Sequence, residues 1–181
     1  MRVPEVKRED LSPADRAYYD DIVESRGGIR GPFPALLHSP QLASLVAATG
    51  HYARFDCVLP NHLREIAIIC ASKENRNQYV FTAHVRLARQ AGVPETIIEA
   101  VKRGNVPDDT PADEAMVMRF ATELVGQRKV SDASFNAVTE RFGIQGAVDL
   151  TGLVGHYMLV MQVINAFDIR HAAEVPLELP A

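Results

Sequence analysis

The sequence has no tryptophan and only two cysteines, Cys57 and Cys70, thirteen residues apart. Neither cysteine belongs to a CxxC pair or lies beside a pattern of metal ligands. Cys70 stands among apolar residues of a helical stretch, which favours a buried structural thiol. Cys57 precedes a helix break, which favours a more reactive one. In a reducing cytosol we expect no disulfide between them.

Several motifs that bind metals or phosphates are also missing. The sequence contains no HExxH, no ExxH on paired helices, no GxSxG and no glycine-rich phosphate loop. We therefore expect neither a bound metal nor a cofactor. Histidines from separate segments could still converge on a metal, but their spacing does not predict it.

An excess of positive charge is absent as well. The formal net charge is −4 and the pI is near 5.9, which gives no electrostatic case for nucleic acid or an anionic membrane. No apolar run approaches the eighteen residues of a membrane helix. The N-terminus is polar and lacks the apolar core of a signal peptide. We expect a cytoplasmic protein.

What the chain does contain is a series of helical patterns. Its 181 residues, 47% of them apolar, fit a single domain over 1–181. Serine or proline signals open helices at Ser12, Ser39-Pro40, Pro60, Pro94, Thr110-Pro111 and Ser131. No segment shows a convincing strand alternation. We predict an all-α bundle of seven to eight helices, with an N-terminal helix over 12–26 and an extended tail over 172–181.

Two of these helices carry the strongest candidates for chemistry. Glu65 and His84 lie nineteen residues apart on consecutive helices. An imidazole in an apolar stripe needs a hydrogen-bond partner, and Glu65 is the nearest plausible one if the helices pack antiparallel. A carboxylate that orients a histidine is a general-base arrangement. The alternative is a buried polar pair that only fixes helix register.

Other polar residues form a second group of candidates. His156 lies seven residues after Asp149 on one helix face, beside Gly152, Gly155 and Tyr157. His38 stands at a helix start. A carboxylate clamp could come from any of six arginines, namely Arg26, Arg30, Arg54, Arg64, Arg86 and Arg89.

The run LREIAIICASKENRNQYVFTAHVRLARQAGVPETIIEAV resembles the core of the carboxymuconolactone decarboxylase family, which includes the alkylhydroperoxidase AhpD-like proteins. The flanking segments GPFPALLHSPQLA and GAVDLTGLVGHYMLVMQVINAF agree with it, so the resemblance covers about 28–167. It implies an AhpD-like helical fold that assembles as a homo-oligomer, a trimer or hexamer, often with sites near subunit contacts.

In the peroxidase branch of this family, the resemblance implies a Glu, a CxxC pair and a His that together relay protons and electrons. The Glu and the His correspond to Glu65 and His84. The two Cys positions correspond to Asn77 and Val80, with Tyr79 between them, so the redox pair is absent. Peroxidase activity is therefore disfavoured.

The decarboxylase branch does not need the dithiol. The resemblance implies a lyase that removes CO₂ from a small carboxylated lactone in the breakdown of aromatic compounds. We expect His84 to transfer the proton, Glu65 to orient His84, and His38, Asn77, Tyr79, Val80 and His156 to line the pocket. The remaining alternative is a non-catalytic oligomer that binds a small acid.

Overall fold

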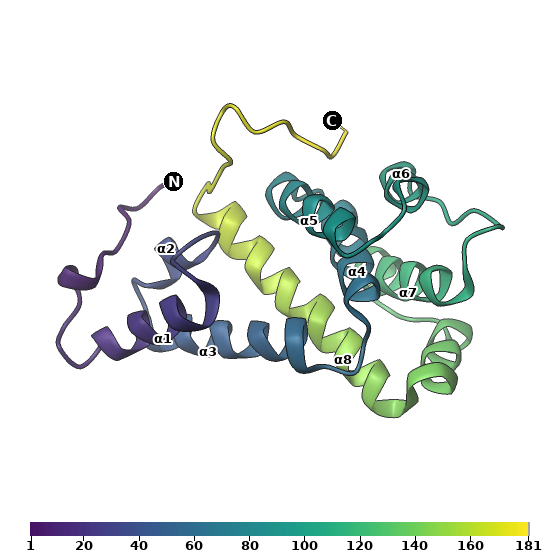
Figure 1. Ribbon diagram of the computed structural model, residues 1–181, viewed down its shortest axis with the longest axis horizontal. Coiled ribbons are helices and arrows are strands. Elements are labelled where there is room, and N and C mark those ends of the chain that lie inside the picture. The colour runs from purple at the N-terminus through teal and green to yellow at the C-terminus, as the bar shows by residue number, and fades with distance from the viewer. Residues whose placement is uncertain (181) are drawn as a thin grey trace.

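The protein, described here by a computed structural model of residues 1–180, is built from helices (Figure 1). Its α-helices are α1 (Arg16–Arg26), α2 (Phe33–Leu36), α3 (Pro40–His51), α4 (Asn61–Glu74), α5 (Gln78–Gln90), α6 (Glu95–Arg103), α7 (Ala112–Thr122) and α8 (Asp132–Ala166). A 3₁₀ turn, Arg8–Asp10, precedes them, and π-helical turns follow α3 (Tyr52–Asp56) and α7 (Glu123–Gln127). No strand occurs within residues 1–180, so the all-α prediction is confirmed.

The helices begin where the capping residues predict. Asn77 precedes α5, and its Oδ1 accepts a hydrogen bond of 2.9 Å from the backbone N–H of Val80. Ser131 caps α8 in the same manner, through the N–H of Ser134. Prolines stand directly before α4, α6 and α7. Local sequence signals therefore define most helix boundaries.

Two boundaries differ from the sequence prediction. The first helix begins at Arg16 and not at Ser12, because the Ser12 hydroxyl bonds with Asp15 in a turn that precedes the helix. The two last predicted helices are limbs of α8, which bends at Gly143 (φ 71°, ψ 179°). Glycine adopts this positive φ without steric cost. The predicted tail has no regular structure as far as residue 180, and its last residue, Ala181, lies outside the described residues.

The long helix α8 joins two apolar clusters. It crosses the molecule between the N-terminal helices α1 to α3 and the helices α4 to α7 (Figure 1). The larger cluster is built on α4, which packs against α5, α7 and α8. The smaller one joins α1, α2 and α3 and is closed by Val163 of α8. The region between the clusters is where side chains from both halves can meet.

By length and composition α8 is the one helix within residues 1–180 that could cross a membrane, with a mean hydropathy of 1.4 over its most apolar window. The sequence prediction missed this window because Asp149 and His156 interrupt the apolar run. More than half of the window, 56%, is buried against the other helices, as in the core helix of a bundle. The cytoplasmic location stays a prediction.

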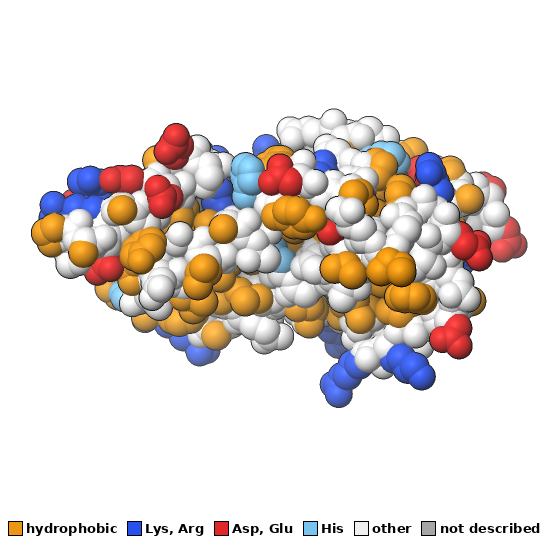
Figure 2. All heavy atoms as spheres, turned by 90° about the horizontal axis from the view of Figure 1, so that it is seen from below, with side chains coloured by type: hydrophobic (Ala, Val, Ile, Leu, Met, Phe, Trp, Pro, Cys, Tyr) orange, Lys and Arg blue, Asp and Glu red, His pale blue; other side chains and the backbone are white. Residues whose placement is uncertain are grey.

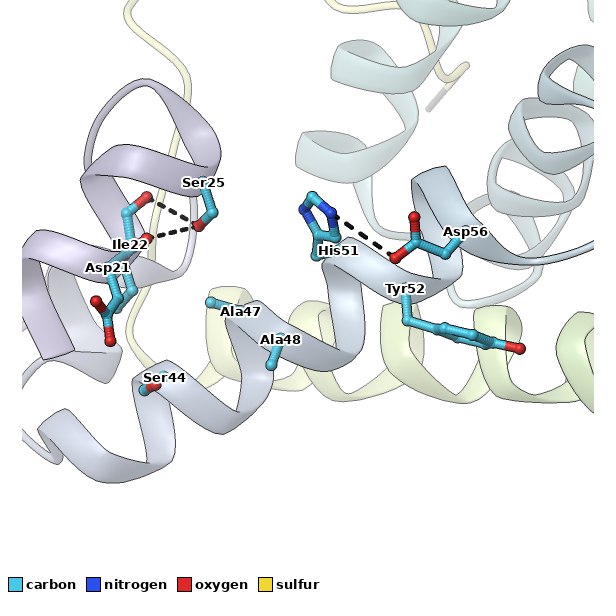
Figure 3. A pocket seen from close by; sticks show the side chains of 9 residues that line it. All are labelled: Asp21, Ile22, Ser25, Ser44, Ala47, Ala48, His51, Tyr52 and Asp56. Atoms are coloured by element: carbon cyan, nitrogen blue, oxygen red, sulfur yellow. Dashed lines mark hydrogen bonds and ion pairs between the residues drawn. The ribbon is translucent and has the colours of Figure 1, made fainter.

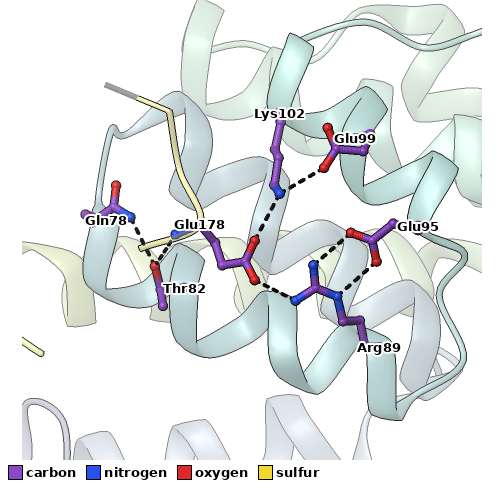
Figure 4. A network of polar contacts seen from close by, with 7 residues as sticks. All are labelled: Gln78, Thr82, Arg89, Glu95, Glu99, Lys102 and Glu178. Carbon is purple, nitrogen blue, oxygen red and sulfur yellow. Dashed lines mark hydrogen bonds and ion pairs between the residues drawn. The ribbon is translucent and has the colours of Figure 1, made fainter. Parts of the chain in front are cut away.

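The C-terminal tail returns across α5 and α6 (Figure 4). Glu178 bridges Arg89 of α5 and Lys102 of α6 at 2.6 and 3.0 Å, and Arg89 also pairs with Glu95. The backbone N–H of Glu178 donates to the hydroxyl of Thr82. These contacts fix the tail against the bundle, and the side chains of Lys102 and Glu178 are only 13% and 23% exposed. The pair of Arg89 with Glu95 is more exposed, and such surface pairs contribute at most about 1 kcal/mol each.

Candidate functional site

A buried carboxylate–imidazole pair forms where α4 packs against α5. Oε2 of Glu65 lies 2.7 Å from Nδ1 of His84, and the two residues are only 4% and 8% exposed. The predicted meeting of these residues therefore occurs. Since a carboxylate oxygen accepts, Nδ1 of His84 is the donor, while its Nε2 makes no hydrogen bond with residues 1–180.

Two aromatic rings of α8 continue from this pair. The ring of Tyr157 meets His84 edge-on at 4.7 Å between centroids, and it meets His156 edge-on at 5.2 Å. Tyr157 therefore lies between the two histidines. Burial raises the pKa of its phenol, so this hydroxyl stays protonated at neutral pH.

Two arginines from the N-terminal half approach the same group. Arg26 ends α1, and Arg54 lies on the π-helical turn after α3. A Cβ atom placed on Gly50 of α3 would lie 2.7 Å from Nε2 of His156 and closer still to the guanidinium of Arg26. The missing side chain of Gly50 thus allows Arg26 and His156 to approach each other.

These neighbours make His156 a neutral imidazole. Burial lowers its pKa to about 4, and the charges of Arg26 and Arg54 add to the shift. The same burial lowers the pKa of Arg26, although a guanidinium remains charged. The candidate site therefore combines one carboxylate–imidazole pair (Glu65 and His84), one neutral imidazole (His156) and two cations (Arg26 and Arg54).

The residues at the CxxC positions of the family have structural contacts at the start of α5. The side-chain amide of Asn77 donates to Oδ1 of Asn165 at 2.8 Å, which ties α5 to α8, while its oxygen caps the helix at Val80. Both residues are buried. Neither offers a nucleophile, so that this part of the site cannot run a dithiol cycle.

The structure does not bring Tyr79 and His38 to the Glu65–His84 pair. The ring of Tyr79 stacks on His171 of the tail, with centroids 4.1 Å apart, and its carbonyl bonds with Nε2 of the same histidine. His38 is exposed and bonds with the carbonyl of Pro4 in the N-terminal arm. Sequence spacing could not reveal that these residues contact the two ends of the chain.

Asp149 has a different role from that suggested by its spacing to His156. Its carboxylate accepts hydrogen bonds of 3.0 Å from the hydroxyl of Tyr52 and from the N–H of Val58. Asp149 therefore holds the π-helical turn, which carries Arg54, against α8. The sequence singled out neither Arg54 nor Arg26 from six arginines, and it gave no reason to consider Gly50.

Both cysteines are buried free thiols. Burial raises the pKa of Cys70 to about 12. The Cys57 thiol lies within hydrogen-bond distance of the carbonyl of Ala53, at 3.2 Å. Neither is placed to replace the missing redox pair.

A cavity of about 380 Å³ lies between α1 and the end of α3 (Figure 3). It is lined by Asp21, Ile22, Ser25, Ser44, Ala47, Ala48, His51, Tyr52 and Asp56. A second, of about 140 Å³, adjoins Cys70 between α4, α6 and α7. Neither is lined by Glu65 or His84, so we locate the site from its polar geometry and not from cavity size.

A family of known proteins matches the middle of the chain. The sequence pattern of the Carboxymuconolactone decarboxylase family matches residues 40–123, the segment that contains Glu65 and His84. The resemblance seen in the sequence is thereby confirmed. The search of curated proteins gave no match.

Solved structures share the fold over almost the whole chain. A variant of the debrominase Bmp8 in complex with 2,3,4-tribromopyrrole superposes with a TM-score of 0.76 at 14% identity, covering 96% of this chain and 92% of that one. The alkylhydroperoxidase AhpD core of an uncharacterized peroxidase-related protein from Ralstonia eutropha JMP134 gives a TM-score of 0.74 at 23% identity, covering 96% and 93%. At these identities the likeness establishes an AhpD-like fold.

Proposed function

We propose that this chain, whose residues 40–123 belong to the carboxymuconolactone decarboxylase family, is a lyase that removes CO₂ from a small carboxylated lactone by proton transfer. The observation that carries the proposal is the buried Glu65–His84 pair, 2.7 Å apart, in a site with no thiols at positions 77 and 80. Such a site retains the groups for moving protons and lacks those for a thiol cycle. The reaction needs no cofactor.

The proposed reaction proceeds through two bond changes at one carbon. The bond between that carbon and the carboxylate breaks, CO₂ leaves, and the electron pair moves into the unsaturated lactone carbonyl. The imidazolium of His84 then gives its Nε2 proton to the carbon that lost CO₂, while Glu65 holds Nδ1. Bulk water returns the proton to Nε2, so that each turnover consumes one proton.

The peroxidase alternative is disfavoured by the thiols. A thiol peroxidase needs a thiolate and a resolving thiol. Both cysteines are buried in the larger apolar cluster: burial raises the pKa of Cys70 to about 12, and Cys57 directly follows the π-helical turn. Neither cysteine occupies position 77 or 80.

The debrominase complex supports a small unsaturated ring as the ligand of this fold. That protein was solved with 2,3,4-tribromopyrrole, a five-membered ring. A lactone ring is of comparable size. This supports a ring-shaped substrate for the present chain.

We also propose that the chain forms a homo-oligomer. Large apolar side chains are exposed on α3, the π-helical turn and α8, namely Leu42, Leu45, Tyr52, Phe55, Val58, Ile144, Val148 and Leu159. Figure 2 shows hydrophobic side chains spread over the face seen from below. Exposed apolar area of this extent is typical of a subunit contact.

An absorbance assay with a panel of carboxylated lactones tests the proposed activity. Wild type should consume at least one of them, and His84→Ala should lose roughly 100-fold or more of that rate, as expected for removal of a general acid. Turnover that survives in His84→Ala would overturn the assignment. Binding without turnover on every lactone would leave the non-catalytic acid-binding protein as the better description.

A further inference from the structure

We infer that Arg26 and Arg54 form a carboxylate-binding subsite beside His156, which anchors the anionic group of the ligand next to the Glu65–His84 pair. The inference rests on the proposed function for its choice of a carboxylate ligand. Its physical basis is independent of turnover, because it concerns two cations that lack a counter-charge.

Neither guanidinium has a carboxylate partner among residues 1–180. Arg26 donates one hydrogen bond from Nη2, to the backbone carbonyl of Ala47 at 3.2 Å, and its Nε is buried without a partner. The Nε of Arg54 is likewise buried and unpartnered. Both residues are only partly buried, but a buried N–H donor has lost its hydrogen bond to water, which is costly unless a partner replaces it. An anionic ligand would supply the missing partner.

Arg26 lies beside His156, since both side chains reach the position that a Cβ atom on Gly50 would occupy. The charges of both Arg26 and Arg54 act on the imidazole of His156 and on the phenol of Tyr157, and Arg54 acts on Arg26 itself. The like charges are thus close enough to disfavour each other. Two guanidiniums from different helices that approach without an intervening acid are the arrangement that binds a carboxylate through parallel N–H donors.

The local backbone allows the close approach of these side chains. Nη2 of Arg26 and Nε2 of His156 both pack where a Cβ atom at position 50 would lie, so this packing requires glycine there. Asp149 holds the π-helical turn at the other side through Tyr52 and Val58. The subsite is therefore built from α1, α3, the π-helical turn and α8.

Aromatic contacts are the competing explanation for the two arginines. The guanidinium carbon of Arg26 lies 4.5 Å from the centroid of the Phe33 ring, and that of Arg54 lies 5.1 Å from Phe55. A cation–π contact offsets part of the cost of burial but leaves the N–H donors unsatisfied. A role limited to these contacts predicts no binding of anions.

The test measures the binding of 2-furoate, a small ring carboxylate, by isothermal titration calorimetry. The neutral 2-furamide is the matched ligand. Arg26→Gln and Arg54→Gln should each weaken furoate binding about tenfold or more, because each removes a charge-assisted hydrogen-bond donor. Arg16→Gln is the matched control, since Arg16 lies on the same helix, also has an unpartnered Nε, and is near Asp20. It should bind furoate as wild type does.

Two further measurements separate loss of binding from loss of folding. Circular dichroism checks that each variant is folded, and Arg54→Lys tests the shape of the donor while keeping its charge. Lysine keeps the positive charge but lacks the paired N–H donors of a guanidinium. The affinity of Arg54→Lys for furoate should therefore lie between that of wild type and that of Arg54→Gln. Equal furoate affinity in wild type, Arg26→Gln and Arg54→Gln would overturn the inference, as would equal binding of furoate and furamide or no furoate binding to wild type.

The outcomes separate this inference from the proposed activity. If the arginine variants lose furoate while no lactone is consumed by wild type, the subsite stands and the lyase proposal fails. If His84→Ala abolishes turnover while the affinity for furoate is the same in wild type and both arginine variants, the lyase proposal stands and the subsite fails.

Discussion

Gly50 of α3 faces His156 of α8 so closely that a Cβ atom on the glycine would lie 2.7 Å from Nε2 of the histidine. Gly50→Ala should therefore displace His156 and Arg26. Overpacking of this kind costs about 1–3 kcal/mol of the free energy of unfolding. We expect that loss in urea denaturation, together with weaker binding of 2-furoate.

Gly152→Ala is the matched control for this prediction. Gly152 lies on α8, and a Cβ atom there would meet nothing within 4 Å. Alanine in a helix interior is favoured over glycine by about 0.5–1 kcal/mol, so this variant should be as stable as wild type or slightly more stable. Equal stability of both variants would show that Gly50 does not hold His156 at close range.

His156 should make the fold sensitive to mild acid. Its pKa is lowered to about 4 in the folded chain by burial and nearby cations, whereas an unfolded histidine titrates near 6.5. Between these values the unfolded chain binds the proton and the folded chain does not. Stability is therefore present above pH 6.5 and is lost as the pH falls toward 4, by about 2 kcal/mol between pH 7 and pH 5.

Urea denaturation at pH 7 and pH 5 checks this, with His156→Gln beside wild type. The variant should lose less stability than wild type over the same interval, by about the same 2 kcal/mol. His38→Gln is the control, since His38 is exposed in the N-terminal segment. An unchanged pH dependence in His156→Gln would contradict the low pKa of this imidazole.

The Glu65–His84 pair should couple in stability. Removing one partner leaves the other buried and unpaired, which costs about 3–5 kcal/mol, whereas replacing both by apolar residues is often nearly neutral. We expect Glu65→Leu/His84→Leu to unfold at higher urea than either single variant. Strictly additive losses in this double-mutant cycle would show that the two side chains do not interact in solution.

The exposed apolar face should be covered by a second copy of the chain. Leu45 is 60% exposed and Val148 is 63% exposed. Leu45→Glu and Val148→Glu should lower the mass measured by light scattering toward that of a single chain, because a charge at a subunit contact is costly to bury. Phe135→Glu is the comparison variant. Phe135 is also an exposed apolar residue, but it lies on the limb of α8 before the Gly143 bend. A monomeric wild type would contradict the oligomer.

Much of the fold could be predicted because its signals are local. Asn77, Pro94 and Ser131 each mark a helix start that the structure confirms, and Gly143 marks the bend of α8. The start of α1 was predicted too early because Ser12 makes its hydrogen bonds in a turn. A serine before a proline fits either role until the tertiary structure is known.

The site was predictable only in part. Glu65 and His84 stood out because a carboxylate and an imidazole in apolar stripes need each other. The choice of Arg26 and Arg54 depends on where α1 and the π-helical turn pack, which no spacing within one helix reveals. The position of Tyr79 could not be predicted from the sequence for the same reason, since its stacking partner His171 lies in the distant C-terminal tail.

The most direct test of the central claim separates proton transfer from thiol chemistry. Lactone turnover and peroxide consumption are measured for wild type, His84→Gln, and a Cys57→Ala/Cys70→Ala double variant. We predict that the double variant keeps wild-type lactone turnover, that His84→Gln loses it by about 100-fold or more, and that no variant shows thiol-dependent peroxide consumption. Loss of activity in the cysteine variant with retention in His84→Gln would contradict the account.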